Sequence, residues 1–270
     1  MRAFNIWHSP KPVAGLADHG RLSSHDKERN TLNKISVVIP VKEEMKLQFH
    51  HKIIDSYQSF PNCELLWVLG PNNDGTCRDL LNRNQRVLLT NSNSRAERIN
   101  IGIRETQNDL VLLNHPRSFL SHEAISTLSE IDCRGGNTWG GFTHEFYQSN
   151  HFALKFTSFY SNRIRFGMTG IIYLDHCIFF TRDIISAQDP APVPMVDIFE
   201  DTLFSEKLRK KVAPLRIREK SFTSPVRFIS NGIFRQSLMN QKLKLKHKLG
   251  FSATKMNRDY EKDLNLNSEY

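Results

Sequence analysis

Residues 35–44 read ISVVIPVKEE, and this stretch decides the fold. Its first five residues are mostly β-branched and end at Pro40, which is typical of a short strand buried on both faces. Similar apolar runs follow at residues 64–69 (ELLWVL), 86–89 (RVLL) and 110–113 (LVLL), with helix-compatible sequence at residues 44–58 and 95–106. Strands that alternate with helices predict crossover connections, and therefore an α/β domain with a doubly wound, mostly parallel sheet.

Ligands of such sheets bind beyond the carboxyl ends of the strands. We therefore expect the functional site in the loops at residues 40–44, 70–75 and 114–118. The second of these loops is a PNNDG turn, whose residue types are those that tight turns favour.

The second half of the sequence is less regular. Residues 139–142 (WGGF) predict a strand, prolines 190, 192 and 194 mark a loop, and residues 199–211 predict a helix. We expect a disordered leader at residues 1–33, one domain at 34–225, a basic amphipathic helical extension at 226–256 and a polar tail at 257–270.

The composition is that of a globular protein with excess positive charge. The chain has 270 residues, 39% of them hydrophobic, and a formal net charge of +9. Basic residues cluster at positions 207–220 and 242–248, so either these are solvated helix faces or the protein binds a phosphorylated substrate, nucleic acid or an anionic membrane. The helix expected at residues 227–249 either packs on the domain or lies on such a membrane.

The four cysteines are widely separated and form no C-x-x-C pair, which suggests neither a zinc site nor a disulfide framework. The sequence contains no segment typical of a signal peptide or a membrane span. We therefore expect a cytoplasmic protein, peripheral to the inner face of the membrane if its basic helix binds lipid.

Four segments in order, ISVVIPVKEE, WVLGPNNDGT, SRAERINIGI and DLVLLNHPRS, resemble the landmarks of family-2 glycosyltransferases with the GT-A fold. The later segments MTGIIYLDHCIFFTRDI and PVPMVDIFEDTLFSEKLRKKV resemble the continuation found in one bacterial branch. The resemblance implies a nucleotide-diphospho-sugar transferase domain with a C-terminal helical extension. It also implies an inverting reaction, in which an acceptor hydroxyl of a glycan or a lipid-linked molecule attacks the anomeric carbon of a nucleotide-sugar donor.

The resemblance also implies catalytic residues. Asp201, in the sequence FED, matches the general base of the family, with Glu200 as its companion, and Asp175 matches an aspartate beside the acceptor. Judged without their surroundings, Glu200 and Asp201 are explained equally well as negative charges at the start of a helix.

Five further residues match positions that bind the nucleotide sugar. Glu44 and Asp74 follow the first and second strands, Arg95 and Asn100 match the family's R-x-x-x-x-N stretch, and Arg117 follows the fourth strand. Three of them have a structural alternative: Asp74 is also a typical turn residue, Glu44 suits a helix start, and Arg95 is otherwise an exposed arginine.

Two positions depart from the family pattern. Leu69 replaces an aspartate that reads the base, and residues 114–117 (NHPR) replace the acidic motif that binds a divalent metal. A hard cation such as Mn²⁺ or Mg²⁺ wants carboxylate oxygens, so this loop does not support a metal cofactor, and a lone His115 before proline is typical of a polar loop.

The departures leave two interpretations open. In the first, Arg117 supplies positive charge to the diphosphate and the enzyme is metal-independent. In the second, the chain is a catalytically inactive GT-A-like domain that binds an anionic partner or a membrane surface. Nucleic acid is a weaker candidate partner, because no recognisable nucleic-acid module accompanies the charge.

Overall fold

The structure is a computed structural model, which describes residues 32–42, 45, 47–133 and 136–261. Residues 1–31 of the expected leader, Glu44, and residues 262–270 of the expected tail lie outside the described residues.

The centre of the domain is an eight-stranded sheet in the order β3-β2-β1-β4-β7-β6-β8-β5. Strands β1 to β4 are parallel to one another, β7 runs antiparallel to both β4 and β6, β8 is parallel to β6, and β5 is antiparallel to β8. The doubly wound, mostly parallel sheet is therefore confirmed, and its first four strands lie where the apolar runs predict them. The strands are β1 (Ile35–Val41), β2 (Cys63–Leu69), β3 (Arg86–Leu89), β4 (Leu110–Leu113), β5 (Ser118–Leu120), β6 (Trp139–Phe146), β7 (Ile178–Thr181) and β8 (Leu215–Thr223).

Helices follow most of the strands, and one of these helices, α6 (Phe152–Phe159), continues into a π-helix. The π-helix is η2 (Tyr160–Thr169), and a 3₁₀ turn, η3 (Leu174–His176), precedes β7. The other helices are α2 (Leu47–Tyr57), α3 (Asp74–Asn82), α4 (Arg95–Arg104), α5 (His122–Glu130), α7 (Glu200–Arg209), α8 (Val226–Asn231), α9 (Ile233–Lys248) and α10 (Ala253–Glu261), with a short turn η4 (Arg182–Ile184).

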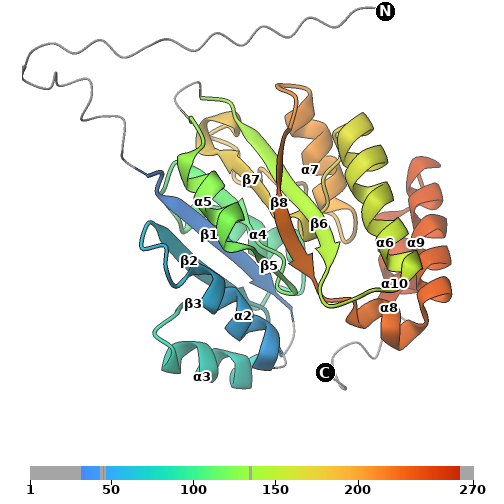
Figure 1. Ribbon diagram of the computed structural model, residues 1–270, viewed down its shortest axis with the longest axis horizontal. Helices are drawn as coiled ribbons and strands as arrows, with labels where there is room; N and C mark the ends of the chain where they lie inside the picture. The colour runs from blue at the N-terminus through green and yellow to red at the C-terminus, as the bar shows by residue number, and fades with distance from the viewer. Residues whose placement is uncertain (1–31, 43–44, 46, 134–135, 262–270) are drawn as a thin grey trace, which may run out of the picture. The chain divides into compact units, whose positions relative to one another are not determined.

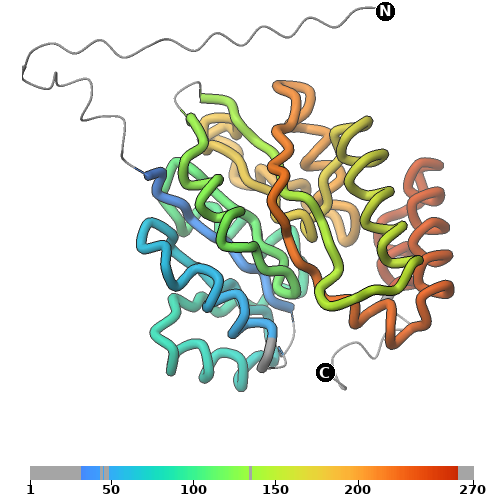
Figure 2. Tube along the Cα trace, viewed as in Figure 1, coloured from blue at the N-terminus to red at the C-terminus, as the bar shows by residue number. Residues whose placement is uncertain are grey.

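Two hydrophobic clusters cover the two faces of the sheet. Ile53 of α2, Leu80 of α3 and Ile125 of α5 belong to one cluster, which also includes the odd-numbered residues of β1. Ile99 of α4 and Phe204 of α7 belong to the other, together with Val38. Because alternate residues of β1 enter opposite clusters, this strand is buried on both faces, as its apolar sequence predicts. Figures 1 and 2 show the sheet between these two helical layers.

The C-terminal helices α8, α9 and α10 pack beside α6. Phe228 of α8 shares a small hydrophobic cluster with Leu154 of α6 and Phe146 of β6, and Ile233 of α9 packs against it. The region expected as a helical extension is helical, and α10 includes the first residues of the expected tail. Within the described residues, no helix has the length and apolar character needed to cross a membrane.

Candidate active site

The loops that follow β1 and β2 meet at the carboxyl edge of the sheet. The buried side chain of Asn73 donates hydrogen bonds from Nδ2 to the carbonyls of Lys42 and Gly70, both at 3.0 Å. A Cβ atom on Gly70 would lie 3.1 Å from the carbonyl oxygens of Lys42 and Ser92, so these strand ends approach as closely as a glycine permits. Two of the three expected loops are thus held together by Asn73, a residue of the PNNDG turn that was not among the predicted site residues.

The residues expected to read the base occupy different environments. Asp74 is exposed and is the first residue of α3, where the helix dipole favours a negative charge. Leu69, which stands where the family has an aspartate, is fully buried in the hydrophobic core. Its side chain therefore packs inside the domain and does not face the loop. Beside Gly70 the structure places a buried cation, Arg98, whose Nη1 donates to the carbonyl of Ser92 at 2.7 Å.

The loop after β4 is organised by Asn114. The amide of this buried residue donates to the carbonyls of His115 at 2.9 Å and Ser118 at 2.8 Å, and its Oδ1 accepts from the Tyr57 hydroxyl at 3.2 Å. Both polar atoms of the Asn114 side chain therefore have hydrogen-bond partners within the protein. Residues 114–117 contain no carboxylate, so the donor set of this loop does not fit a Mn²⁺ or Mg²⁺ ion.

Positive charge surrounds His115. Its Nδ1 accepts a hydrogen bond from the backbone N–H of Arg117 at 3.1 Å. Burial lowers the pKa of His115 well below its ordinary value, and the nearby charges of Arg117, Arg95 and Arg227 lower it further. The imidazole is therefore neutral near pH 7, and the positive charge around it comes from three arginines, which Asp175 partly offsets. Arg227, on α8, was not found from the sequence, because nothing local links it to this loop.

Arg95 joins α4 to α7. Its guanidinium forms an ion pair with the buried carboxylate of Glu200, and its Nη2 lies 3.9 Å from Oδ2 of Asp201. Burial opposes the charge of Arg95, but Glu200 and Asp201 outweigh it and raise its pKa. Arg95 is thus the countercharge of the two carboxylates, and its contact with a diphosphate stays a prediction.

Asp201 is a largely enclosed carboxylate, its side chain 11% exposed, with a raised pKa. Burial, with the charge of Glu200 as the next cause, raises this pKa from 3.8 to about 6. The carboxylate accepts hydrogen bonds from the backbone N–H of Leu174 at 3.0 Å and of Thr202 at 2.7 Å. Just before the pair, Phe199 has a left-handed backbone (φ 66°), an unusual conformation for an aromatic residue that is found preferentially at functional sites.

Asp175 lies close to this pair, in the 3₁₀ turn before β7. Its backbone carbonyl accepts a hydrogen bond from Ser221 at 2.7 Å, and its carboxylate oxygens lie 3.7 Å from Nε2 of His144 and 3.9 Å from Nε2 of His176. Burial acts to raise the pKa of Asp175, but His144, His176 and Arg165 together hold it well below its usual range. Asp175 is therefore ionised near neutral pH, unlike its raised-pKa neighbour Asp201.

His176 is neutral, as its hydrogen bonds indicate. Its Nδ1 lies 2.8 Å from the carbonyl of Phe142 and donates to it, so Nε2 carries the lone pair and accepts from Arg165 at 3.0 Å. Burial lowers the pKa of His176 to about 3, and Arg165 contributes to the lowering.

Two cations from distant segments complete this side of the site. The Arg165 guanidinium lies 3.3 Å from the centroid of the Tyr173 ring, and the Lys244 ammonium of α9 lies 5.8 Å from the same centroid. Burial, with Arg165 as the next cause, lowers the pKa of Lys244 to about 8. In the sequence, Lys244 stands out only as part of a basic run, and Arg165 has no local pattern that marks it.

Asn100 holds the proline-rich loop before α7. Its Nδ2 donates to the carbonyl of Val193 at 2.8 Å, and its Oδ1 accepts from the N–H of Val193 at 2.9 Å. The donor and the acceptor of this buried amide thus both bind the backbone of Val193. Asn100 therefore positions the segment that leads to Glu200 and Asp201, and a direct contact with the donor stays a prediction.

A histidine and aspartate cluster lies between α2 and α3. The Nε2 atoms of His50 and His51 lie 2.6 Å and 3.1 Å from Oδ2 of Asp79, and Arg83 pairs with the same carboxylate. The three ligand atoms lie within 4.8 Å of one another, as a metal ion requires. However, a metal on Nε2 of His50 would move its proton to the buried Nδ1, which has no hydrogen-bond partner among the described residues. We therefore interpret the cluster as a polar contact between helices.

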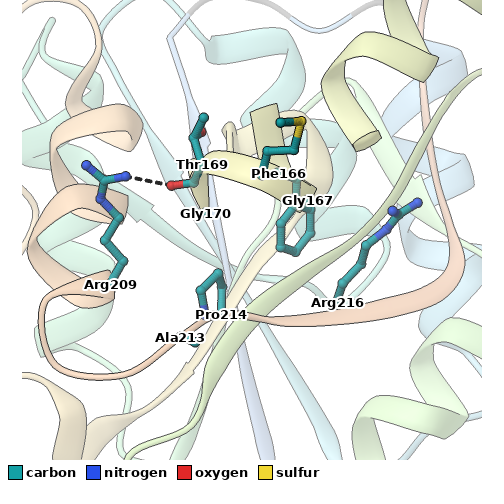
Figure 3. Close-up of a pocket in the computed structure, with 9 residues that line it drawn as sticks. Phe166, Gly167, Thr169, Gly170, Arg209, Ala213, Pro214 and Arg216 are labelled. Atoms are coloured by element: carbon teal, nitrogen blue, oxygen red, sulfur yellow. Dashed lines mark hydrogen bonds between the residues drawn. The ribbon is translucent and has the colours of Figure 1, made fainter. Parts of the chain in front are cut away.

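A cavity of about 370 Å³ lies at the opposite edge of the sheet, near the amino end of β8 (Figure 3). Arg209 and Arg216 flank it, but both guanidinium groups bind backbone: Arg209 donates to the carbonyl of Thr169 at 2.6 Å, and Arg216 to that of Asn162 at 3.2 Å. The cavity is therefore separate from the acidic cluster and does not take part in it.

Comparison with known proteins agrees on the architecture. No protein-family model matches the chain, and the search of curated proteins gives no match. Among solved structures, S. aureus TarS 1-349 is similar with a TM-score of 0.56 at 15% identity, over 72% of this chain and 62% of TarS 1-349. Glucosyl-3-phosphoglycerate synthase from Mycobacterium tuberculosis, in complex with Mn²⁺, uridine diphosphate and phosphoglyceric acid, is similar with a TM-score of 0.55 at 12% identity, over 81% of this chain and 79% of that one.

These likenesses define the class of the domain: the chain has the GT-A fold of nucleotide-diphospho-sugar transferases. It spans less than two thirds of the TarS 1-349 chain. At this level of identity the shared property is the fold, so family 2 and its bacterial branch remain predictions.

Proposed function

We propose that the chain is a glycosyltransferase that moves a sugar from a nucleotide-sugar donor to a hydroxyl acceptor with inversion of configuration. The observation that carries the proposal is Asp201, a largely enclosed carboxylate with a pKa raised to about 6, which lies beside Glu200 and Arg95 in a domain with the GT-A fold. A general base works best when its pKa lies near the operating pH, so this environment suits proton abstraction.

In the proposed reaction Asp201 removes the proton of the acceptor hydroxyl. The acceptor oxygen then attacks the anomeric carbon of the donor, and the bond from this carbon to the diphosphate oxygen breaks. Glu200 and Arg95 hold Asp201 in place, while Asp175, ionised and fixed through its backbone by Ser221, orients the acceptor. Asp74 and Asn100 are the remaining described residues proposed at the donor site, the first directly and the second through the loop that it holds.

The leaving diphosphate needs positive charge, which the arginines supply in this proposal. Arg117 stands in the loop after β4 where other such enzymes place a metal-binding acid, and Arg227 and Arg95 contribute to the same positive environment around His115. Arginine binds phosphate oxygens through two parallel hydrogen bonds, so these groups suit a developing diphosphate charge without a carboxylate-bound cation.

A second candidate function is a catalytically inactive GT-A-like domain that binds an anionic partner. The observation that favours it is the engagement of Arg95 with Glu200 and Asp201, which leaves fewer cations for a diphosphate. In either case we propose a location at the cytoplasmic face of a membrane, for which the C-terminal helices supply the contact.

The test is nucleoside diphosphate release by the purified full chain with UDP-GlcNAc, UDP-glucose and GDP-mannose, in Mn²⁺ and in EDTA. TarS 1-349 has a structure in complex with UDP-GlcNAc, which makes this donor the first choice. We expect Asp201→Asn to lower turnover about 100-fold or more, because a general base contributes that much, while circular dichroism shows the variant folded. Asp197→Asn, an exposed aspartate of the same segment, is the matched control. Equal turnover in the two variants would exclude Asp201 as the base, and no turnover or binding with any donor would favour the inactive domain.

A further inference from the structure

The helix α6 and the π-helix η2 form one continuous helical segment, and the outward side of this segment is apolar. Phe152, Phe156, Phe159 and Met168 are all exposed, Phe152 to 81% and Met168 to 74%. A surface helix of a globular protein normally turns its polar side outward and its apolar side to the core. This helical segment has a buried apolar side, with Leu154, and a second apolar side that no described residue covers.

The long helix α9 repeats this arrangement. Phe234 and Leu238 lie one turn apart and are 81% and 73% exposed, and Leu245 and Leu249 continue the same side of the helix two turns further on. The opposite side of α9 carries the buried Leu243.

The two outward sides belong to neighbouring helices. The Lys244 ammonium of α9 lies 5.5 Å from the centroid of the Tyr160 ring at the start of η2, and Ile233 packs against the cluster that contains Leu154. Figure 1 shows α6 and α9 together at one end of the sheet. We call this the apolar-basic surface, defined by Phe152, Phe156, Phe159, Met168, Phe234 and Leu238.

The charge around the apolar-basic surface is predominantly positive. Residues 146–174 and 221–258, which build it, contain no Asp or Glu, and the neighbouring Asp259 of α10 is paired with Lys246 of α9. The exposed basic residues include Lys155 and Arg163 on α6 and η2, and Lys242 and Lys248 on α9. Exposed aromatic and aliphatic side chains among lysines and arginines are typical of helices that lie in the interface of an anionic membrane.

We propose that the apolar-basic surface docks on an anionic lipid bilayer, with its apolar side chains among the lipid headgroups and its cations on the lipid phosphates. Docking does not depend on sugar transfer. It would nevertheless bring the candidate site to the membrane, because Lys244 also lies beside Tyr173, two residues before Asp175. Of the two acceptor classes considered above, a lipid-linked hydroxyl fits this placement.

The test is co-sedimentation of the purified full chain with vesicles of phosphatidylglycerol and phosphatidylethanolamine, compared with vesicles of phosphatidylcholine. We expect binding to the anionic vesicles that weakens in 0.5 M salt, because the Debye length then falls to about 4 Å and the attraction between lipid phosphates and protein cations is screened. Phe156→Ser with Phe234→Ser should lower the partition coefficient about tenfold or more, because each removes an apolar side chain from the interface. Lys242→Glu with Lys248→Glu should lower it at least as much.

Leu81→Ser with Leu89→Ser is the matched control, because these leucines are exposed on α3 and β3, away from the apolar-basic surface. We expect this pair to bind vesicles as the unchanged chain does, and circular dichroism should show all variants folded. Equal binding to both vesicle types, no binding to either, or an equal loss in the control would overturn the proposal. So would a dimer, seen by light scattering, that Phe156→Ser with Phe234→Ser dissociates, since a second copy would then cover the surface.

Discussion

The guanidinium of Arg95 and the carboxylate of Glu200 form an ion pair between helices whose first residues stand 105 positions apart in the sequence. Arg95 opens α4 and Glu200 opens α7, so the pair joins the positive ends of two helix dipoles through one shared contact. The ion pair also fixes the position of Asp201, the next residue of α7. The candidate base is therefore held from the first half of the chain, although it belongs to the second.

The cost of breaking this pair can be measured. Arg95→Gln should lower the free energy of unfolding by about 2 kcal/mol, because the buried Glu200 loses its countercharge, while the partial exposure of Arg95 moderates the effect. Adding Glu200→Gln to this variant should recover part of the loss. Urea unfolding of both single variants and the double variant measures the coupling, and strictly additive changes would contradict it. Arg78→Gln, on the exposed side of α3, is the control.

The pH dependence of activity should report Asp201. Only the carboxylate form accepts a proton, so kcat/KM should rise with pH through about 6 and then level off. Glu200→Gln should move this rise to lower pH, since the charge of Glu200 contributes to the raised pKa. A rise that stays in place would show that another group titrates.

The same pKa sets the sign of a stability change. The folded pKa of Asp201 lies above its ordinary value of 3.8, so its contribution to stability is fully present below pH 3.8 and is lost as the pH rises through about 6. Unfolding of Asp201→Asn should lack this loss. Urea titrations of both proteins between pH 4 and pH 7 compare the slopes, and parallel slopes would contradict the assignment.

Arg117 should carry nucleotide affinity that does not need a metal. We expect Arg117→Ala to weaken binding of UDP about tenfold or more in EDTA, because a charged hydrogen bond contributes about 1.5–3 kcal/mol. Arg117→Lys should recover only part of the affinity, since lysine lacks the two-pronged geometry. Calorimetry measures both variants, with Arg78→Ala as the control. Unchanged affinity in Arg117→Ala would remove this residue from the donor site.

Asn100 should act through the loop that it holds. Asn100→Ala leaves the buried N–H and carbonyl of Val193 without their partner, so we expect a loss of about 1–3 kcal/mol in unfolding free energy. Asn82→Ala, at an exposed position, should change stability by less than about 0.5 kcal/mol. A stable Asn100→Ala variant with weakened donor binding would instead assign Asn100 to the nucleotide.

The first half of the fold was predictable because its strands are buried on both faces and their apolar runs are unmistakable. β8 was missed for the opposite reason. Its sequence, LRIREKSFT, alternates charged and buried residues, and its partner β6 lies more than 60 positions earlier. From sequence alone, a strand with charged residues on one side cannot be distinguished from a surface loop, because its pairing partner is not known.

The candidate site divides in the same way. Arg95, Glu200, Asp201 and Asp175 were expected from local motifs, and the structure brings them close together. Three further cations near them were not expected, because Arg165, Arg227 and Lys244 stand in helices without a recognisable pattern and meet the site only through tertiary packing. The sequence could name the candidate carboxylates and Arg95, but not the distant residues that complete their surroundings.

The π-helix η2 has a consequence for how this protein can change. A π-helix carries extra residues relative to an α-helix, so deleting one residue between Tyr160 and Thr169 would tighten the turn and rotate everything after it by roughly 100°. A deletion before Arg165 would turn Arg165 and Phe166 away from His176, which they now contact, and would also move Met168 relative to the apolar-basic surface. A single deletion here would therefore change the surroundings of His176 and the exposed apolar surface together.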